Sequence, residues 1–175
     1  DLILAFDRDI VTPQDDSVMQ IAPASGQQII LRRSRGLAPN YFPAPFQSDD
    51  TLLAMGAELK SAFALLDGHN LYISQYLGDQ ANYESQTSFT STLQHMLNLV
   101  QVMPAEILID KHPSYFVSGS GRELASAWEI PVTEVQHHVA HFSAVLGENN
   151  LLQEKETVLG VVWDGTGYGD DGHIW

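Results

Sequence analysis

Short apolar runs recur along the chain, and their spacing predicts a mixed α/β domain. The first three runs after residue 50 have the length of strands, and residues 67–70 (DGHN) form a turn between the second and the third. Further on, apolar residues spaced three and four apart alternate with short apolar runs. The predicted strands are residues 52–56, 62–66, 71–77, 107–109, 131–135 and 158–163, and the predicted helices are residues 89–100, 115–128 and 138–146.

This order of elements is typical of a ribonuclease-H-like or actin-like ATPase lobe. A meander of three strands comes first, and helices then alternate with strands in an αβαβα pattern. Proteins of this class often carry two such lobes that clamp a nucleotide. We therefore expect an α/β fold in which residues 158–163 open a second lobe.

A proline-rich stretch divides the chain near residues 39–50. Its prolines cannot continue a helix or a central strand, so we expect an extended connector. Before it, residues 17–21 and 28–32 are predicted to form two strands of a hairpin. Residues 1–47 hold few large apolar side chains, and we expect them to be the β-rich end of a larger domain.

Composition narrows the possible functions. The formal net charge of −14, from 8 basic and 22 acidic residues, argues against nucleic-acid binding. No cysteine is present, so any metal ion must be held by histidine and carboxylate. No apolar run is long enough to span a membrane and no signal peptide opens the chain, so we expect a cytoplasmic protein without a membrane partner. Arg32, Arg33 and Arg35 form the one dense basic patch, which either binds an anion or is only a charged strand end.

Three histidines lie within five positions. His137 and His141 are four residues apart, so on a helix they share a face and can hold one metal ion. Two imidazoles and a carboxylate suit iron, zinc or manganese. His138 lies between them and is a further candidate. The alternative is that these side chains make ordinary packing contacts and hydrogen bonds.

The last predicted strand ends in a glycine-rich loop of sequence DGTGYG. Glycine lets backbone N–H groups approach a phosphate, Thr166 offers a hydroxyl, and Asp164 can hold a metal ion or a water molecule. The alternative is a tight hairpin turn that requires glycine. The candidate nucleotide-binding residues are Asp164, Gly165, Thr166, Gly167 and Tyr168.

Two other loops carry candidates. Glu58 and Lys60 lie between the first two strands of the meander, where Lys60 can neutralise a phosphate. A solvated Glu/Lys pair in a turn is the alternative. His112 follows a predicted strand at its carboxyl end, where open α/β sheets place their ligands. It is equally well explained as a loop histidine.

Seven stretches, in a fixed order along the whole chain, resemble the HypF-type carbamoyltransferases of nickel–iron hydrogenase maturation. They are residues 15–18 (DDSV), 32–39 (RRSRGLAP), 56–60 (GAELK), 74–79 (SQYLGD), 110–113 (DKHP), 136–141 (QHHVAH) and 164–169 (DGTGYG). Members of this family have an acylphosphatase-like domain, a zinc-finger pair, a YrdC-like domain and a domain similar to tRNA threonylcarbamoyl transferases. The resemblance implies that residues 1–47 end the YrdC-like domain. It implies that residues 48–175 are the first lobe, and the opening strand of the second, of the transferase-like domain.

The resemblance also implies a chemistry. Such enzymes use ATP with magnesium to convert carbamoyl phosphate into carbamoyl-AMP, and they pass the carbamoyl group to the C-terminal cysteine of HypE. That group becomes a cyanide ligand of the hydrogenase iron. His137 and His141 match the histidines that bind iron or zinc, and residues 164–168 match the loop that contacts the nucleotide. A further metal-ligand aspartate is expected in the second lobe, so the isolated chain is expected to bind metal weakly or not at all. Because it holds only half of the nucleotide clamp, it is also expected to be inactive.

Two other interpretations remain open at this stage. A tRNA threonylcarbamoyl-transferase-like enzyme would share the fold and the histidine pair, but the charge of −14 and the YrdC-like segment disfavour it. A non-catalytic docking module is the other.

Overall fold

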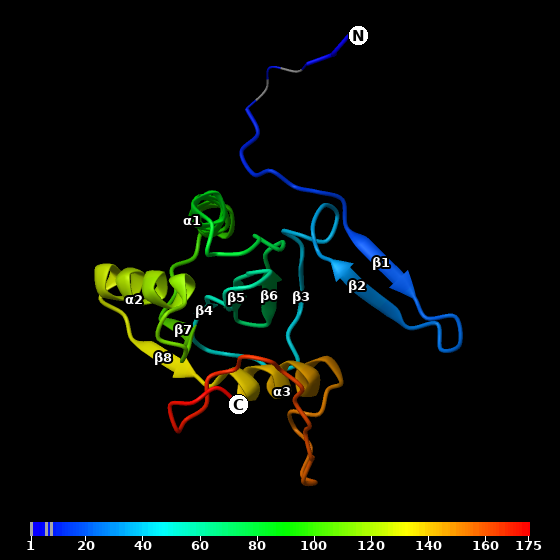
Figure 1. The fold of residues 1–175 in the computed structure, drawn as a ribbon, viewed down its shortest axis with the longest axis vertical. Coiled ribbons are helices and arrows are strands. Elements are labelled where there is room, and N and C mark those ends of the chain that lie inside the picture. The colour runs from blue at the N-terminus through cyan, green and yellow to red at the C-terminus, as the bar shows by residue number, and fades with distance from the viewer. Residues whose placement is uncertain (1, 6, 8) are drawn as a thin grey trace.

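The computed structural model of the 175-residue chain describes residues 2–5, 7 and 9–175. Two sheets and three helices make up this part of the chain (Figure 1). The small sheet pairs β1 (Val18–Ile21) with β2 (Gln28–Arg32) as an antiparallel hairpin, as predicted. The larger sheet and its helices consist of β3 (Tyr41–Pro43), β4 (Leu52–Ala54), β5 (Ala64–Asp67), β6 (Asn70–Ile73), α1 (Tyr83–Val100), β7 (Glu106–Asp110), α2 (Phe116–Trp128), β8 (Val132–Val135) and α3 (His137–Glu148).

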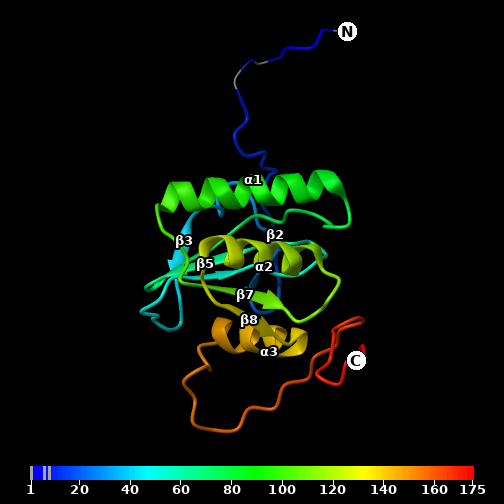
Figure 2. The same ribbon diagram turned by 90° about the vertical axis from the view of Figure 1, so that its left-hand side faces the viewer.

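The larger sheet has the strand order β3-β6-β5-β4-β7-β8. Strands β4, β5 and β6 form the predicted antiparallel meander, and β7 and β8 continue parallel to β4. This order agrees with the lobe that the sequence predicts. Helices α1 and α2 lie on one side of the sheet and α3 lies on the other (Figure 2). The parallel strands bring their carboxyl ends to one edge of the sheet, beside the start of α3.

The core lies between the sheet and the pair α1 and α2. Helix α1 buries the stripe that its spacing predicts, because positions one and two turns apart share a face. By contrast, α3 contains no buried residue, although its start carries the histidines. The buried apolar side chains of the core are Leu53, Met55, Phe63, Leu65, Leu77, Phe89, Leu93, Met96, Leu97, Ile107, Ile109, Val117 and Ala125.

Two predictions for the chain between and after these elements need correction. The proline-rich connector is more than an extended link, because β3 pairs with β6 as an edge strand in the register Tyr41↔Tyr72. Pro43 is tolerated there, since an edge strand has one side without ladder hydrogen bonds. Residues 158–163 were predicted to be a strand, and they form none: Leu159 is 89% exposed and Trp163 98%. No strand in the described part of the chain lies beside them to satisfy their backbone groups.

None of the described helices is both long enough and apolar enough to cross a membrane.

Two glycines of α2 test the close packing of this helix on β7. A Cβ at Gly121 would meet Ile109 Cγ2 at 2.5 Å and Met55 Cγ at 3.0 Å, whereas a Cβ at Gly119 has open space. We expect Gly121→Ala to lower the free energy of unfolding by about 1–3 kcal/mol through overpacking. Gly119→Ala is expected to raise it by up to about 1 kcal/mol, because alanine favours a helix. Urea unfolding of the two variants measures both values, and equal effects would contradict the close approach.

Candidate functional site

The candidate site lies where the parallel strands end. β7 ends at Asp110, β8 leads directly into the start of α3, and the register Asp110↔Val135 places these two ends side by side. The loop of residues 164–169 reaches the same edge, because the Gln136 side chain donates a hydrogen bond from Nε2 to the Tyr168 carbonyl oxygen at 3.1 Å. Three segments far apart in sequence therefore meet at one edge of the sheet.

Asp110 fixes the orientation of His137. Its Oδ2 accepts a hydrogen bond from His137 Nδ1 at 2.5 Å, and its Oδ1 accepts one from the backbone N–H of His112 at 2.8 Å. The carboxylate is nearly buried, with 6% of its side chain exposed. With the proton on Nδ1, the Nε2 lone pair of His137 is free to act as a ligand. A carboxylate behind a histidine is the common support of a metal ligand.

His137, His141 and Asp164 form a group that can hold a metal ion. His137 Nε2 lies 3.2 Å from His141 Nε2 and 3.4 Å from Asp164 Oδ2, and the three ligand atoms lie within 4.8 Å of one another. Asp164 Oδ2 is buried and has no hydrogen-bond partner. A buried carboxylate oxygen without a partner is costly, and a cation between these atoms would satisfy it. Two imidazoles and a carboxylate suit zinc or iron.

The glycines of the loop let Asp164 reach this position. A Cβ at Gly167 would lie 2.4 Å from the His138 ring and 2.6 Å from Asp164 Oδ2, so the loop can pass here only without a side chain. Burial raises the pKa of Asp164, but hydrogen bonds from the backbone N–H groups of residues 165–167, together with His137, outweigh burial and hold this pKa below its usual range. The carboxylate is therefore kept in the ionised form that a metal requires.

Gln136 joins the loop to α3. Its Oε1 accepts a hydrogen bond from the backbone N–H of Val139 at 2.9 Å, which caps the helix, and its Nε2 lies 2.8 Å from His138 Nδ1. The ring of His138 lies 3.7 Å from Asp164 Oδ2 and stacks on Trp175. His138 thus supports the loop from the side and is not one of the three grouped ligand atoms.

An aromatic platform supports the loop from the other side. The His112 ring stacks on Tyr115, with ring centres 4.0 Å apart, and meets the Tyr168 ring edge-on at 5.4 Å. Burial raises the pKa of the Tyr115 hydroxyl, which hydrogen-bonds to the Thr166 side chain. His112 is therefore brought to the candidate site, where its ring packs against the loop.

Glu58 has a structural task. Its Oε2 accepts a hydrogen bond from the backbone N–H of Phe116 at 2.9 Å, at the first turn of α2. The N-cap residue Tyr115 makes no side-chain cap of its own, so Glu58 caps this helix from another loop.

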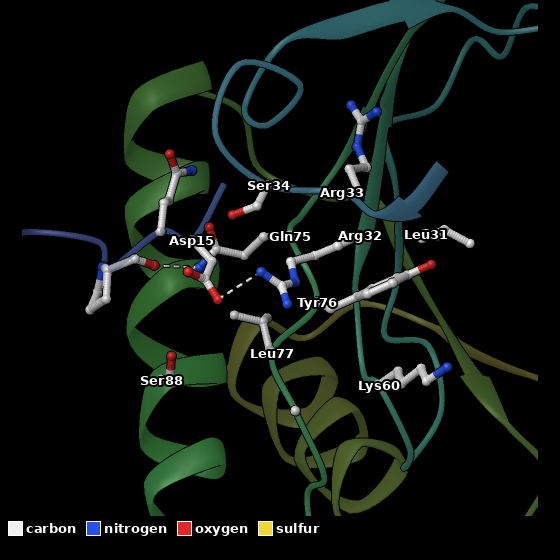
Figure 3. A pocket seen from close by; sticks show the side chains of 13 residues that line it. Asp15, Leu31, Arg32, Arg33, Ser34, Lys60, Gln75, Tyr76, Leu77 and Ser88 are labelled. Atoms are coloured by element: carbon white, nitrogen blue, oxygen red, sulfur yellow. Dashed lines mark hydrogen bonds and ion pairs between the residues drawn. The ribbon is translucent and has the colours of Figure 1, made fainter. Parts of the chain in front are cut away.

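Lys60, which was predicted to neutralise a phosphate, does not line the cavity beside the histidines. A cavity of about 360 Å³ between α3 and the sheet is lined by His137 and His141 but not by Lys60. Lys60 instead lines a second hollow of about 640 Å³, together with Arg32 and Arg33 (Figure 3). The structure thus separates the predicted phosphate ligands into two places.

The three arginines of the basic patch have different surroundings. Arg33 donates hydrogen bonds to the carbonyl oxygens of Ile73, Leu37 and Asn40, and burial lowers its pKa. Arg33 therefore fastens the connector to the sheet. Arg32 pairs with Asp15 at 3.0 Å, facing the hollow, whereas Arg35 pairs with Asp16 at 3.1 Å and does not line it.

Residues 47–148 match the family model described as the HypF Kae1-like domain. The chain belongs to the HypF family. It is 42% identical over 175 residues to the carbamoyltransferase HypF of Synechocystis, and 34% identical over 176 residues to that of Rhizobium leguminosarum. These matches span the whole chain and 22% of each relative, so the chain corresponds to about a fifth of their length.

Two solved HypF structures share the fold. A full-length HypF in the phosphate- and nucleotide-bound form is 34% identical, with a TM-score of 0.86, over 98% of this chain and 26% of that one. The HypF of T. kodakarensis is also 34% identical, with a TM-score of 0.80, over 93% of this chain and 20% of that one.

Several residues that orient the side chains of the site through hydrogen bonds were not predicted. Asp110 was not predicted to be the partner of His137, although the predicted strands 107–109 and 131–135 end just before these two residues and so gave a usable signal. The cap made by Gln136 and the hydrogen bond of Tyr115 to the loop were also missed. These contacts depend on side-chain directions that spacing alone does not give.

Two variants of Glu58 separate the effect of its helix cap from the effect of its charge. Glu58→Ala should lower the free energy of unfolding by about 1 kcal/mol, as loss of a cap does, whereas Glu58→Gln keeps the accepting oxygen and should not. Burial raises the pKa of Glu58 in the folded chain. Because burial outweighs the hydrogen bond from Phe116, which favours the ionised form, the Glu58 carboxyl group stabilises the fold most at pH values below its unfolded-state pKa. This stabilisation is lost as the pH rises through the folded-state pKa. Urea unfolding at several pH values should show this dependence in the parent chain but not in Glu58→Gln. An equal loss in both variants would exclude the cap.

Proposed function

We propose that this chain supplies the first lobe of an ATP-dependent carbamoyltransferase domain, with iron or zinc bound by His137, His141 and Asp164. The observation that carries this proposal is the group of three ligand atoms within 4.8 Å, one of them a buried carboxylate oxygen without a partner. Relatives named carbamoyltransferase HypF match the full length of the chain. We further propose that residues 1–47 end a YrdC-like domain and that residues 48–175 hold the first lobe and the start of the second.

The reaction proposed for the longer protein has three steps. Carbamoyl phosphate is hydrolysed to carbamate and phosphate. A carbamate oxygen then attacks the α-phosphorus of magnesium-bound ATP, which gives carbamoyl-AMP and releases pyrophosphate. Finally the thiolate of the C-terminal cysteine of HypE attacks the carbamoyl carbon, and AMP leaves. The solved HypF in the phosphate- and nucleotide-bound form supports nucleotide binding within the family.

The residues of this chain have distinct tasks in the proposal. When bound, the metal ion would supply a positive charge that offsets the charge of the adenylate. Asp110 holds His137 in the tautomer that presents Nε2. Backbone N–H groups of residues 165–167 hold the Asp164 carboxylate in its ionised form, and the platform of His112 and Tyr115 keeps this loop in place.

Removal of the histidine pair tests the metal assignment. We expect the double variant His137→Ala, His141→Ala in a full-length HypF carrying these residues to lose bound metal and carbamoyl transfer to the HypE cysteine. His69→Ala, in the turn between β5 and β6, is the control and should retain both. Metal analysis and mass spectrometry of HypE measure the two outcomes. Unchanged metal content in the double variant would refute the assignment.

Two glycines of the loop provide a finer test. Gly167→Ala places a methyl group against His138 and Asp164, so we expect it to weaken metal binding by about tenfold or more, as loss of a well-placed ligand or its support does. Gly165→Ala meets open space and should bind metal as the parent does. Cobalt titration followed by visible absorption compares the two variants. Equal affinities would argue against Asp164 as a ligand.

A further inference from the structure

We propose that the face formed by α1 and α2 packs against the same face of a second copy of the chain, in an antiparallel two-fold arrangement. The two helices lie side by side on one side of the larger sheet, away from α3 and its histidines (Figure 2). Two hollows of about 530 Å³ and 570 Å³ follow one another along this face, and Gln94 lines both of them. They form a single groove between α1 and α2, with Gln94 at its middle.

None of the described residues that line the groove is charged, although 17% of the residues in the chain are. Glu84 and His95 of α1 lie outside both linings. So do Arg122 and Glu123 of α2. Depletion of charged residues distinguishes the centre of a protein interface from ordinary surface. Because the chain carries a net charge of −14, two copies repel each other least where they meet through an uncharged face.

The polar side chains of the groove already have hydrogen-bond partners within α1. Thr87 and Thr90 each donate a hydrogen bond of 3.0 Å to a carbonyl oxygen of the preceding turn. Ser91 does the same at 3.1 Å, and Gln94 Nε2 donates to Asn98 Oδ1 at 3.1 Å. Burial of a polar group is costly mainly when the group is left without a partner. These donors keep their partners, so the groove can be buried in an interface at small cost.

The two ends of the groove complement each other. Tyr83, which is 77% exposed, and Phe116 line the end where both helices begin. Met103, which is 58% exposed, and Trp128 line the end where both helices finish. A two-fold axis near Gln94 places the Tyr83 end of one copy on the Met103 end of the other, and symmetry forms this contact twice. Methionine sulfur packs favourably against aromatic rings, so the antiparallel arrangement is favoured over the parallel one.

The face is large enough for a stable pair. With 18 residues in α1 and 13 in α2, the helices are about 27 Å and 20 Å long. At a diameter of about 10 Å for each helix, one copy contributes roughly 500 Å². Two copies together therefore bury on the order of 1,000 Å², which is about the lower bound for a biological interface.

The oligomeric state of a full-length HypF carrying these residues tests the proposal. We expect the parent protein to sediment as a dimer in analytical ultracentrifugation at high micromolar concentration. Gln94→Lys opposes two like charges at the axis and should weaken the dimer by about tenfold or more. Gln153→Lys, at an exposed position after α3, changes the net charge equally and should leave the dimer unchanged. A monomeric parent, or a Gln94→Lys variant that dimerises as the parent does, would overturn the proposal.

A mixture of two variants separates loss of this contact from loss of folding. Gln94→Glu should also be monomeric, because two carboxylates then oppose each other. Mixed in equal amounts, Gln94→Lys and Gln94→Glu should form a heterodimer, since the ammonium group of one copy meets the carboxylate of the other. Monomers that do not associate on mixing would contradict a two-fold axis at Gln94. Metal content, measured in parallel, should be equal in all variants because Gln94 lies outside the metal-binding group.

Discussion

The hydrogen bond between Asp110 and His137 is the contact on which the candidate site depends. It exists because β7 and β8 run parallel in a register that ends both strands at one edge of the sheet. The same Asp110 also holds the backbone of His112, and its carbonyl oxygen accepts a hydrogen bond from Ser118 in α2. Through its carboxylate and its backbone carbonyl, this one residue ties α3, the loop of His112 and α2 together.

The helices and strands could be predicted from the sequence wherever the spacing of apolar residues determines them. The stripe of α1 and the meander follow from spacing, since a helix needs a single apolar face and a strand needs alternation or a short apolar run. Residues 158–163 show the limit of this reasoning. Their apolar composition is that of a strand, but a strand also requires a neighbour to satisfy its backbone, and composition does not reveal whether one is present.

The candidate site could be predicted only in part, for a similar reason. His137 and His141 follow from helical spacing alone, because both lie on the same helix. Lys60 was predicted to neutralise a phosphate because of its place in the order of elements. It has a φ of +48° and lines a different hollow from the cavity beside the histidines. Glu58, two residues earlier, is committed to capping α2. A loop's position in the order of elements does not determine where each of its side chains lies.

The junction between the two sheets also has a physical requirement. Every residue of β1 and β2 is exposed, so the hairpin has no buried core of its own and keeps a fixed position only if specific contacts tie it to the larger sheet. Arg33 meets this requirement, since it fastens to Ile73 of β6 while its neighbour Arg32 faces the hollow. Gln75 adds a second tie through its hydrogen bond to the Pro13 carbonyl oxygen at 2.6 Å. Of these two consecutive arginines, Arg33 ties the hairpin to the larger sheet, whereas Arg32 keeps its charged side chain at the hollow.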